Sequence, residues 1–258
     1  SPAAPTPTAP ASSPWISYAG YILAAAFAAA LGYFVFRPSV VSAPASAISV
    51  RATITLPKDG PLNGVTGTRS LALSRDGKLL TYVAKSANGN QLFLRRMDAT
   101  EATPVAGTEN AAEPTFSPDG QWIAFNSVDR KIQKISILGG APQVICSFAG
   151  QSTRGIWWGE NDTLLIGTMA GEILRVSANG GNPTPVTVLD SAGGEISHRY
   201  PLLLPDHRSI IYVAKLNNIT TFDDALIVGQ RLDTGERKVL VRGGTFPRYL
   251  PSGHLVYI

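Results

Sequence analysis

An eight-residue pattern recurs five times between residues 70 and 253, and it constrains the fold more than any other feature of the chain. Residues 113–120 read EPTFSPDG; the other copies are SLALSRDG (70–77), GIWWGEND (155–162), YPLLLPDH (200–207) and FPRYLPSG (246–253). One position near the end of each copy serves as its anchor: Asp76, Asp119, Asn161, Asp206 and Ser252. Successive anchors are 42 to 46 residues apart. A period of this length is typical of architectures in which each repeat is one supersecondary unit.

The residues after each anchor predict that the unit is made of strands. Short apolar runs rich in β-branched and aromatic residues follow four anchors: KLLTYVA (78–84), QWIAFNS (121–127), TLLIGTM (163–169) and RSIIYVA (208–214). Two more strand-like segments and a turn complete each unit, and no helical period lies between them. Four strands per repeat predict an all-β fold, a β-propeller of four-stranded antiparallel blades. We expect four complete blades, at 54–107, 108–146, 147–189 and 190–241, and a truncated fifth from Arg242.

The anchor side chains are expected to build turns. A carboxylate in this place can accept backbone N–H groups across the tight turn between the first two strands, and a following Gly tolerates positive φ. We therefore interpret Asp76, Asp119, Asn161 and Asp206 as structural turn residues and not as metal ligands. The third copy has GENDT where the pattern has SPDGK, so its turn is expected to differ.

The N-terminal segment differs in composition from the repeats. Residues 1–50 contain one charged side chain, Arg37, whereas residues 51–258 contain the other 39. Residues 1–14 are rich in Pro and Ala and predict an extended juxtamembrane linker, with a further domain expected before it. Residues 15–36 are uncharged, about 33 Å long as a helix and aromatic at both ends, which predicts one transmembrane helix. A short tether (37–51) then leads to the propeller (52–258).

The predicted membrane helix leaves two questions open. Gly20, Ala24, Ala28 and Gly32 form a stripe of small residues through which two helices could dimerise, although so many Ala and Gly residues produce such a stripe easily. Arg37 and Arg51 follow the helix and no basic residue precedes it. Taken alone, this asymmetry would place the propeller in the cytoplasm.

The amino-acid sequences of the repeats resemble those of a known family. SRDGKLLTY, SPDGQWIAF and LPDHRSIIY resemble TolB-like propeller repeats. Longer stretches, among them RATITLPKDG and GEISHRYPLLLPD, are similar to the C-terminal sensor region of bacterial membrane-bound serine/threonine protein kinases. The resemblance covers residues 15–258 and implies a single-pass protein of the cell membrane with an extracytoplasmic, periplasmic-side propeller that binds a ligand or a protein. It implies no catalytic residues here, since the kinase's Gly-rich loop, H-R-D and D-F-G are absent.

Composition excludes several other classes. One Cys, Cys146, excludes an internal disulfide, and three His make a metal centre improbable, so we predict no metal and no cofactor. A net charge of +4 without a block of like charges argues against nucleic-acid binding. No nucleophile–base pair is recognisable, which predicts that the residues present are not an enzyme. Two alternatives stay open: the propeller of a prolyl-oligopeptidase-like peptidase, whose G-x-S-x-G is absent here, or the sensor part of a membrane-bound winged-helix regulator.

One set of residues is a candidate ligand site. The residue just before the innermost strand of each blade is, in order, Arg69, Ala112, Arg154, Arg199 and Thr245. Equivalent positions of a propeller form a ring, so the three Arg residues could converge at one channel mouth and bind a carboxylate or phosphate. His198 and Trp157 could add a hydrogen bond and a stacking face. The alternative is that Glu109, Glu113 or Glu195 neutralises each Arg.

Overall fold

The computed structural model describes residues 69–86, 89–147 and 152–258, all within the unit Ile54–Ile258. The predicted linker (1–14), membrane helix (15–36), small-residue stripe and tether (37–51) lie outside the described residues. Within the described ranges, no helix is long and apolar enough to cross a membrane.

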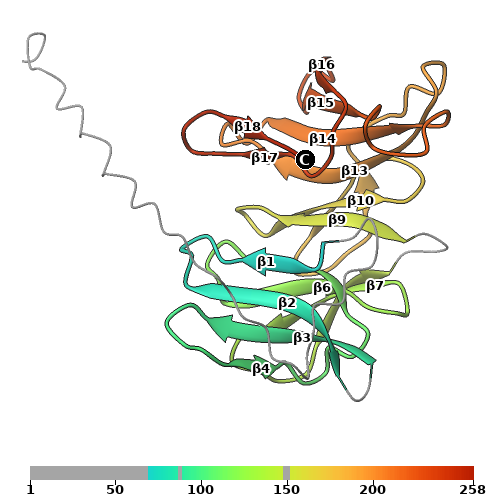
Figure 1. Cartoon of the computed structure of the whole chain (residues 1–258). Helices are drawn as coiled ribbons and strands as arrows, with labels where there is room; N and C mark the ends of the chain where they lie inside the picture. Colours follow the sequence, from blue (N-terminus) through green and yellow to red (C-terminus); the bar gives the residue numbers. More distant parts are fainter. Residues whose placement is uncertain (1–68, 87–88, 148–151) are drawn as a thin grey trace, which may run out of the picture. The chain divides into compact units, whose positions relative to one another are not determined.

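The described residues form four antiparallel four-stranded sheets and one two-stranded sheet, joined by turns. Figure 1 shows how their strands are arranged. In every sheet the strands are adjacent in chain order, so each sheet is a simple meander. The five sheets, called blades 1 to 5, are β1 (Leu71–Leu73), β2 (Leu79–Ser86), β3 (Gly89–Arg96) and β4 (Ala102–Pro104); β5 (Ala112–Phe116), β6 (Trp122–Asn126), β7 (Lys131–Ser136) and β8 (Gln143–Ser147); β9 (Thr153–Trp158), β10 (Thr163–Thr168), β11 (Leu174–Ser177) and β12 (Thr184–Pro185); β13 (Glu195–Leu203), β14 (Ser209–Leu216), β15 (Leu226–Arg231) and β16 (Arg237–Arg242); β17 (Arg248–Tyr249) and β18 (Leu255–Val256). The predicted all-β class and four-stranded blades are confirmed, together with a fifth blade of two strands.

The turn between the first two strands of blades 1 and 2 is built identically. Ser117 Oγ donates to Asp119 Oδ1 at 2.5 Å and accepts the N–H of Trp122 at 2.9 Å, while Asp119 Oδ1 accepts the N–H of Gln121 at 3.0 Å. Asp76 has the same partners in blade 1, Ser74 Oγ at 2.6 Å and the N–H of Lys78 at 3.1 Å. In both blades the turn is therefore closed by two side chains, the anchor Asp and the Ser two residues before it.

In blades 3 and 4 the corresponding turn is stabilised in other ways. Asp206 Oδ1 accepts the N–H groups of Arg208 and Ser209 at 3.0 and 2.9 Å. In blade 3, Asn161 and Asp162 both adopt left-handed backbone conformations, with φ of 57° and 53°. Asn and Asp tolerate this conformation better than other non-glycine residues, which explains how GENDT replaces SPDGK in this turn.

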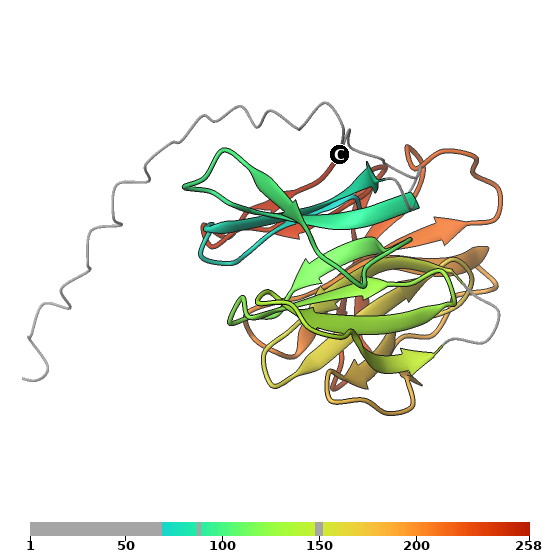
Figure 2. The same ribbon diagram turned by 90° about the horizontal axis from the view of Figure 1, so that it is seen from below.

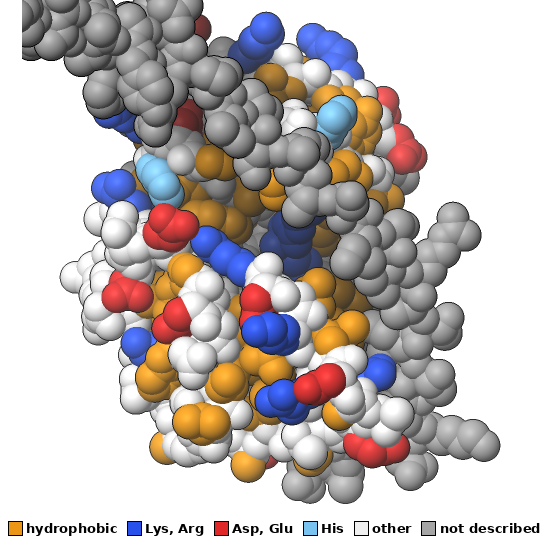
Figure 3. All heavy atoms as spheres, turned by 90° about the vertical axis from the view of Figure 1, so that its left-hand side faces the viewer, with side chains coloured by type: hydrophobic (Ala, Val, Ile, Leu, Met, Phe, Trp, Pro, Cys, Tyr) orange, Lys and Arg blue, Asp and Glu red, His pale blue; other side chains and the backbone are white. Residues whose placement is uncertain are grey.

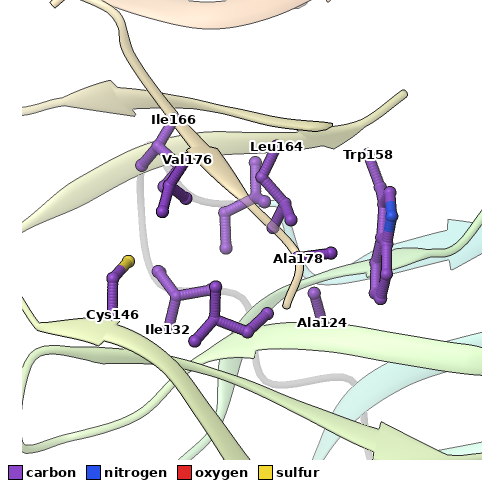
Figure 4. Close-up of a cluster of buried hydrophobic side chains, with 10 residues drawn as sticks. Ala124, Ile132, Cys146, Trp158, Leu164, Ile166, Val176 and Ala178 are labelled. Carbon is purple, nitrogen blue, oxygen red and sulfur yellow. The ribbon is translucent and has the colours of Figure 1, made fainter. Parts of the chain in front are cut away.

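Hydrophobic clusters between successive blades form the core. The two faces of each blade alternate along its strands, so neighbouring residues of one strand pack into different clusters. In β6, Ile123 and Phe125 pack against blade 1, whereas Ala124 packs against blade 3. Figure 4 shows the cluster between blades 2 and 3, in which Ile132 and Cys146 lie opposite Leu164, Ile166 and Val176. Further clusters join blade 3 to blade 4 and blade 4 to blade 5. Figure 2 shows the blades from a second direction.

Candidate functional site

The innermost strands of all five blades border one cavity. Its volume is about 380 Å³. The third position of the eight-residue pattern contributes one residue from each blade: Ala72, Thr115, Trp157, Leu202 and Arg248. This position of the repeat therefore lines the cavity in each of the five blades. Arg69 and Arg75 of blade 1 also line the cavity, as do the exposed side chains of Leu71 and Leu73.

A β-bulge recurs at the start of the innermost strand. The pairing register shifts between Ala112 and Thr115 in blade 2 and between Arg199 and Leu202 in blade 4, with a matching shift in blade 3. The first residue of the pattern has a positive φ in blades 2 to 5: Glu113 (55°), Gly155 (95°), Tyr200 (51°) and Phe246 (51°). Three of these four residues are not glycine, and such strained bulges redirect side chains next to functional sites.

Arg69 carries polar atoms that the protein leaves without a partner. Its Nε and Nη2 atoms are buried and make no hydrogen bond with any of the described residues. The guanidinium carbon lies 6.0 Å from the ring centre of Tyr200. Burial, followed by the nearby positive charge of Arg248, lowers the pKa of Arg69 to about 9. The cation at this end of the cavity is therefore poorly compensated.

Arg154 and Arg199 lie together at the end of β10. Arg199 donates from Nη2 to the carbonyl oxygen of Met169 at 3.0 Å and from Nε to Ser197 Oγ at 2.7 Å. Arg154 donates from Nη1 to the carbonyl oxygen of Thr153 at 2.8 Å, and its Nη2 lies 3.6 Å from the sulfur of Met169. The structure thus brings these two predicted residues close to each other. Each donates one hydrogen bond to a backbone oxygen, and the buried Nε of Arg154 has no hydrogen-bond partner among the described residues.

A buried carboxylate, Glu113, lies among these cations. Its Oε2 accepts the N–H of Gly155 at 2.9 Å, and within the described ranges its buried Oε1 has no hydrogen-bond partner. Burial raises the pKa of Glu113, although that backbone hydrogen bond and the charges of Arg69 and Arg154 act in the opposite direction. A carboxyl group whose ionisation is disfavoured compensates neighbouring cations only weakly.

Neutralisation by the other two acids is not what the structure shows. Glu109 accepts hydrogen bonds from Gln91 Nε2 and the N–H of Gly107, both at 3.3 Å. Glu195 pairs with Arg237, 42 residues away, instead of Arg199. Among the described residues, no carboxylate oxygen lies within 4.0 Å of the guanidinium groups of Arg69, Arg154 or Arg199.

The structure does not bring His198 to this cluster. The side chain of His198 is fully buried, with Nδ1 2.8 Å from Thr187 Oγ1 and Nε2 3.0 Å from Glu195 Oε2. Its ring packs on Tyr212, with ring centres 4.4 Å apart. Both ring nitrogens of His198 are thus engaged within the protein, and consecutive strand residues such as His198 and Arg199 point to opposite faces.

Trp157, in contrast, lines the cavity as the sequence suggested. Its six-membered ring lies over Gly159, where an added Cβ would stand 2.0 Å from Cζ3. Glycine here, where the other repeats have Ser or Leu, therefore lets the indole fold back along its own strand. The sequence analysis missed Arg248, which the third pattern position would have identified.

Figure 3 shows one face of the described unit, on which basic side chains lie recessed between hydrophobic ones. No group of three or more His, Cys, Asp and Glu residues suited to a metal ion occurs within the described ranges. What the cavity presents is thus cationic groups, an indole and aliphatic walls.

Comparisons with known proteins identify the fold. The sequence matches no protein-family model and no curated protein sequence. Its structure resembles that of a TolB-like protein from Agrobacterium tumefaciens, with a TM-score of 0.59 at 17% identity, covering 73% of this chain and 74% of the other. A chain of the nidogen/laminin complex matches with a TM-score of 0.57 at 14% identity over 72% and 70% of the two chains. A chain of the Kuenenia stuttgartiensis hydrazine synthase matches at 0.56 and 15%, covering 76% and 57%. The chain therefore contains a β-propeller of TolB-like fold.

Proposed function

We propose that this chain is a binding module with no chemistry of its own, an extracytoplasmic sensor propeller that takes up a ligand or a protein partner. In this proposal a single helix over residues 15–36 anchors it in the cell membrane, and it forms the C-terminal part of a serine/threonine protein kinase. The kinase and membrane context rests on the sequence resemblance and on the uncharged 22-residue segment.

One observation carries the binding role: a cavity of about 380 Å³ at the centre of the blades, bordered by unpaired cationic groups and apolar side chains. This volume lies within the range of small-molecule sites, which combine apolar walls with a few polar anchors. A partner protein could also insert a side chain there. One of the similar folds comes from a protein–protein complex, that of nidogen and laminin, which is consistent with a protein partner.

Three candidate nucleophiles or bases, Cys146, His198 and the Ser252–His254 pair, do not line the cavity, which supports a non-catalytic role. Cys146 is 5% exposed, and burial raises the pKa of its thiol to about 11. Both ring nitrogens of His198 are engaged. Ser252 Oγ lies 3.0 Å from His254 Nδ1, but both are exposed residues of one hairpin turn at an anchor position of the repeat.

Two measurements on the full chain in living cells test the proposal. A photo-crosslinking residue at Leu71, which is 52% exposed and borders the cavity, should give a covalent adduct visible as a mass shift. The same residue at Val188, which is 77% exposed and does not border the cavity, is the matched control. Equal or absent adducts at both positions would overturn the binding role. Phosphatase and fluorescent-protein reporters after Ile258 should report an extracytoplasmic end; a fluorescent, phosphatase-negative fusion would overturn the location.

A further inference from the structure

The third pattern position separates the cavity into two chemically distinct parts. Arg248 of blade 5 occupies this position beside Arg69, whereas Trp157 and Leu202 occupy it in blades 3 and 4. The remaining two positions hold the small residues Ala72 and Thr115, which leave room in front of them. One side of the cavity is therefore cationic, and another is aromatic and aliphatic.

The cationic side has unsatisfied hydrogen-bonding capacity. Arg69 has two buried nitrogen atoms without partners, and Arg248 donates only from Nη1 to the carbonyl oxygen of Pro247, at 3.3 Å. After the larger effect of burial, the positive charge of Arg248 also lowers the pKa of Arg69. Leaving the buried donors of Arg69 unpaired is costly, and an anion held between Arg69 and the exposed Arg248 would relieve both the charge repulsion and the missing hydrogen bonds of Arg69.

Glu113 is the acid best placed to compete with such an anion. It is fully buried, bonded to the backbone of Gly155, and not within 4.0 Å of a guanidinium nitrogen of Arg69. Arg75, at another part of the cavity wall, is already paired with Glu160 at 3.3 Å. Among the described residues that line the cavity, the cations without a carboxylate within 4.0 Å are therefore Arg69 and Arg248.

We propose that the cavity binds a small organic anion: a carboxylate held by Arg69 and Arg248, with a flat apolar body lying against Trp157 and Leu202. A planar guanidinium binds a carboxylate through two parallel hydrogen bonds, and an indole face offers stacking area to an aromatic ring. The inference rests on the proposed binding function, which it narrows to one chemical class of ligand.

Titration calorimetry of the detergent-solubilised full chain with 2-naphthoate and with the neutral 2-naphthamide tests this assignment. The carboxylate should bind saturably, at least about tenfold more tightly than the amide, and its affinity should fall as salt is raised from about 0.1 to about 1 M. Arg248→Gln should weaken naphthoate binding about tenfold or more and leave naphthamide binding unchanged. The matched control, Arg242→Gln, removes an exposed Arg of β16 outside the cavity and should change neither.

Several results would overturn the assignment. These are no saturable binding of naphthoate, equal binding of acid and amide, or equal effects of Arg248→Gln and Arg242→Gln. Circular dichroism and the thermal midpoint of each variant establish that a loss of binding is not a loss of folding. Failure here is distinguishable from failure of the proposed function, because a partner crosslinked at Leu71 but not at Val188 would still identify a binding module.

Discussion

Nη1 of Arg75 lies 3.3 Å from Oε1 of Glu160, so the first turn of blade 1 is paired with the first turn of blade 3. The two residues occupy the same position of the eight-residue pattern, at which blades 2, 4 and 5 have Pro118, Pro205 and Pro251. The two repeats that lack the proline thus carry opposite charges that meet. His207 of blade 4 adds a third turn to this group, with Nε2 3.6 Å from Oε2 of Glu160.

The Arg75–Glu160 pair should contribute little stability despite its position. Both side chains are about half exposed, at 45% and 55%, and exposed pairs are worth about 0–1 kcal/mol. A double-mutant cycle with Arg75→Ala and Glu160→Ala, measured by urea unfolding, should give a coupling free energy of about 0.5 kcal/mol. The coupling should vanish at about 1 M salt. A coupling of several kcal/mol would mean that the pair is a structural clasp.

Glu195 should make the stability of the chain sensitive to acid. Burial alone would raise its pKa, but hydrogen bonds from His198, Arg237 and the N–H of Asp190 outweigh burial and lower the pKa to about 2. Because the pKa is lower in the folded state, the stabilisation is present above the unfolded pKa of about 4.5 and is lost as pH falls towards 2. It amounts to about 3 kcal/mol, from the size of the shift.

Unfolding free energies measured across this pH range check the prediction. Glu195→Gln should be less stable than the parent chain by about 3 kcal/mol near neutral pH and should lose less stability than the parent below pH 4.5. Glu101→Gln, at an exposed position, is the control and should follow the parent curve. If Glu195→Gln kept the parent's acid dependence, another group would be responsible for it.

The sequence predicted the blades because the signal for them is local and repeated. Turn-forming groups such as Ser117 and Asp119 lie within a few residues of their partners, so spacing alone predicts their hydrogen bonds. The candidate site was harder to predict from the sequence than the blades, for two reasons. Glu113, Tyr200 and Phe246 adopt positive φ without being glycine, so nothing in the sequence announced the bulge that redirects the neighbouring side chains.

Long-range pairing was the second reason. Glu195 and Arg237 meet across 42 residues, and nothing in the strand pattern distinguishes Arg237 from Arg199 as the partner of that carboxylate. The sequence analysis used the position just before the inner strand, and of the three Arg residues there, Arg69 lines the cavity. The third residue of the pattern, and not the residue that precedes the pattern, lines the cavity in all five blades. In blade 5 this third residue is Arg248.

Cys146 should be inert in the folded protein. Its side chain is 5% exposed within the cluster between blades 2 and 3, and burial raises the pKa of the thiol to about 11. The thiolate is the reactive form, so a chromogenic disulfide reagent at mildly alkaline pH should label the native chain far more slowly than the chain in guanidinium chloride. The chain has one Cys, so the labelling stoichiometry reports this site alone. Fast, complete labelling under native conditions would show that the interface between these blades opens.

Gly167 should be intolerant of even one added methyl group. It lies in β10 at the register shift between Ile166 and Thr168, where a Cβ would stand 2.3 Å from the carbonyl oxygen of Arg154 and 3.0 Å from Cα of Arg199. All of these obstructing atoms are backbone, so Gly167→Ala must push β10 away from β9 and β13, the inner strands of blades 3 and 4. We expect a loss of about 3 kcal/mol, the upper part of the range for overpacking.

Gly229→Ala is the matched control for this substitution. Its Cβ would meet Cδ1 of Leu240 at 3.2 Å, and that partly exposed side chain can rotate away. We expect a loss below about 1 kcal/mol for the control, so thermal unfolding should separate the two variants clearly. Since Gly167 adjoins the backbone of Arg154 and Arg199 but neither Arg69 nor Arg248, any folded fraction of Gly167→Ala should still bind naphthoate. Equal melting points for the two variants would show that β10 at Gly167 is not in close contact with the inner strands of blades 3 and 4.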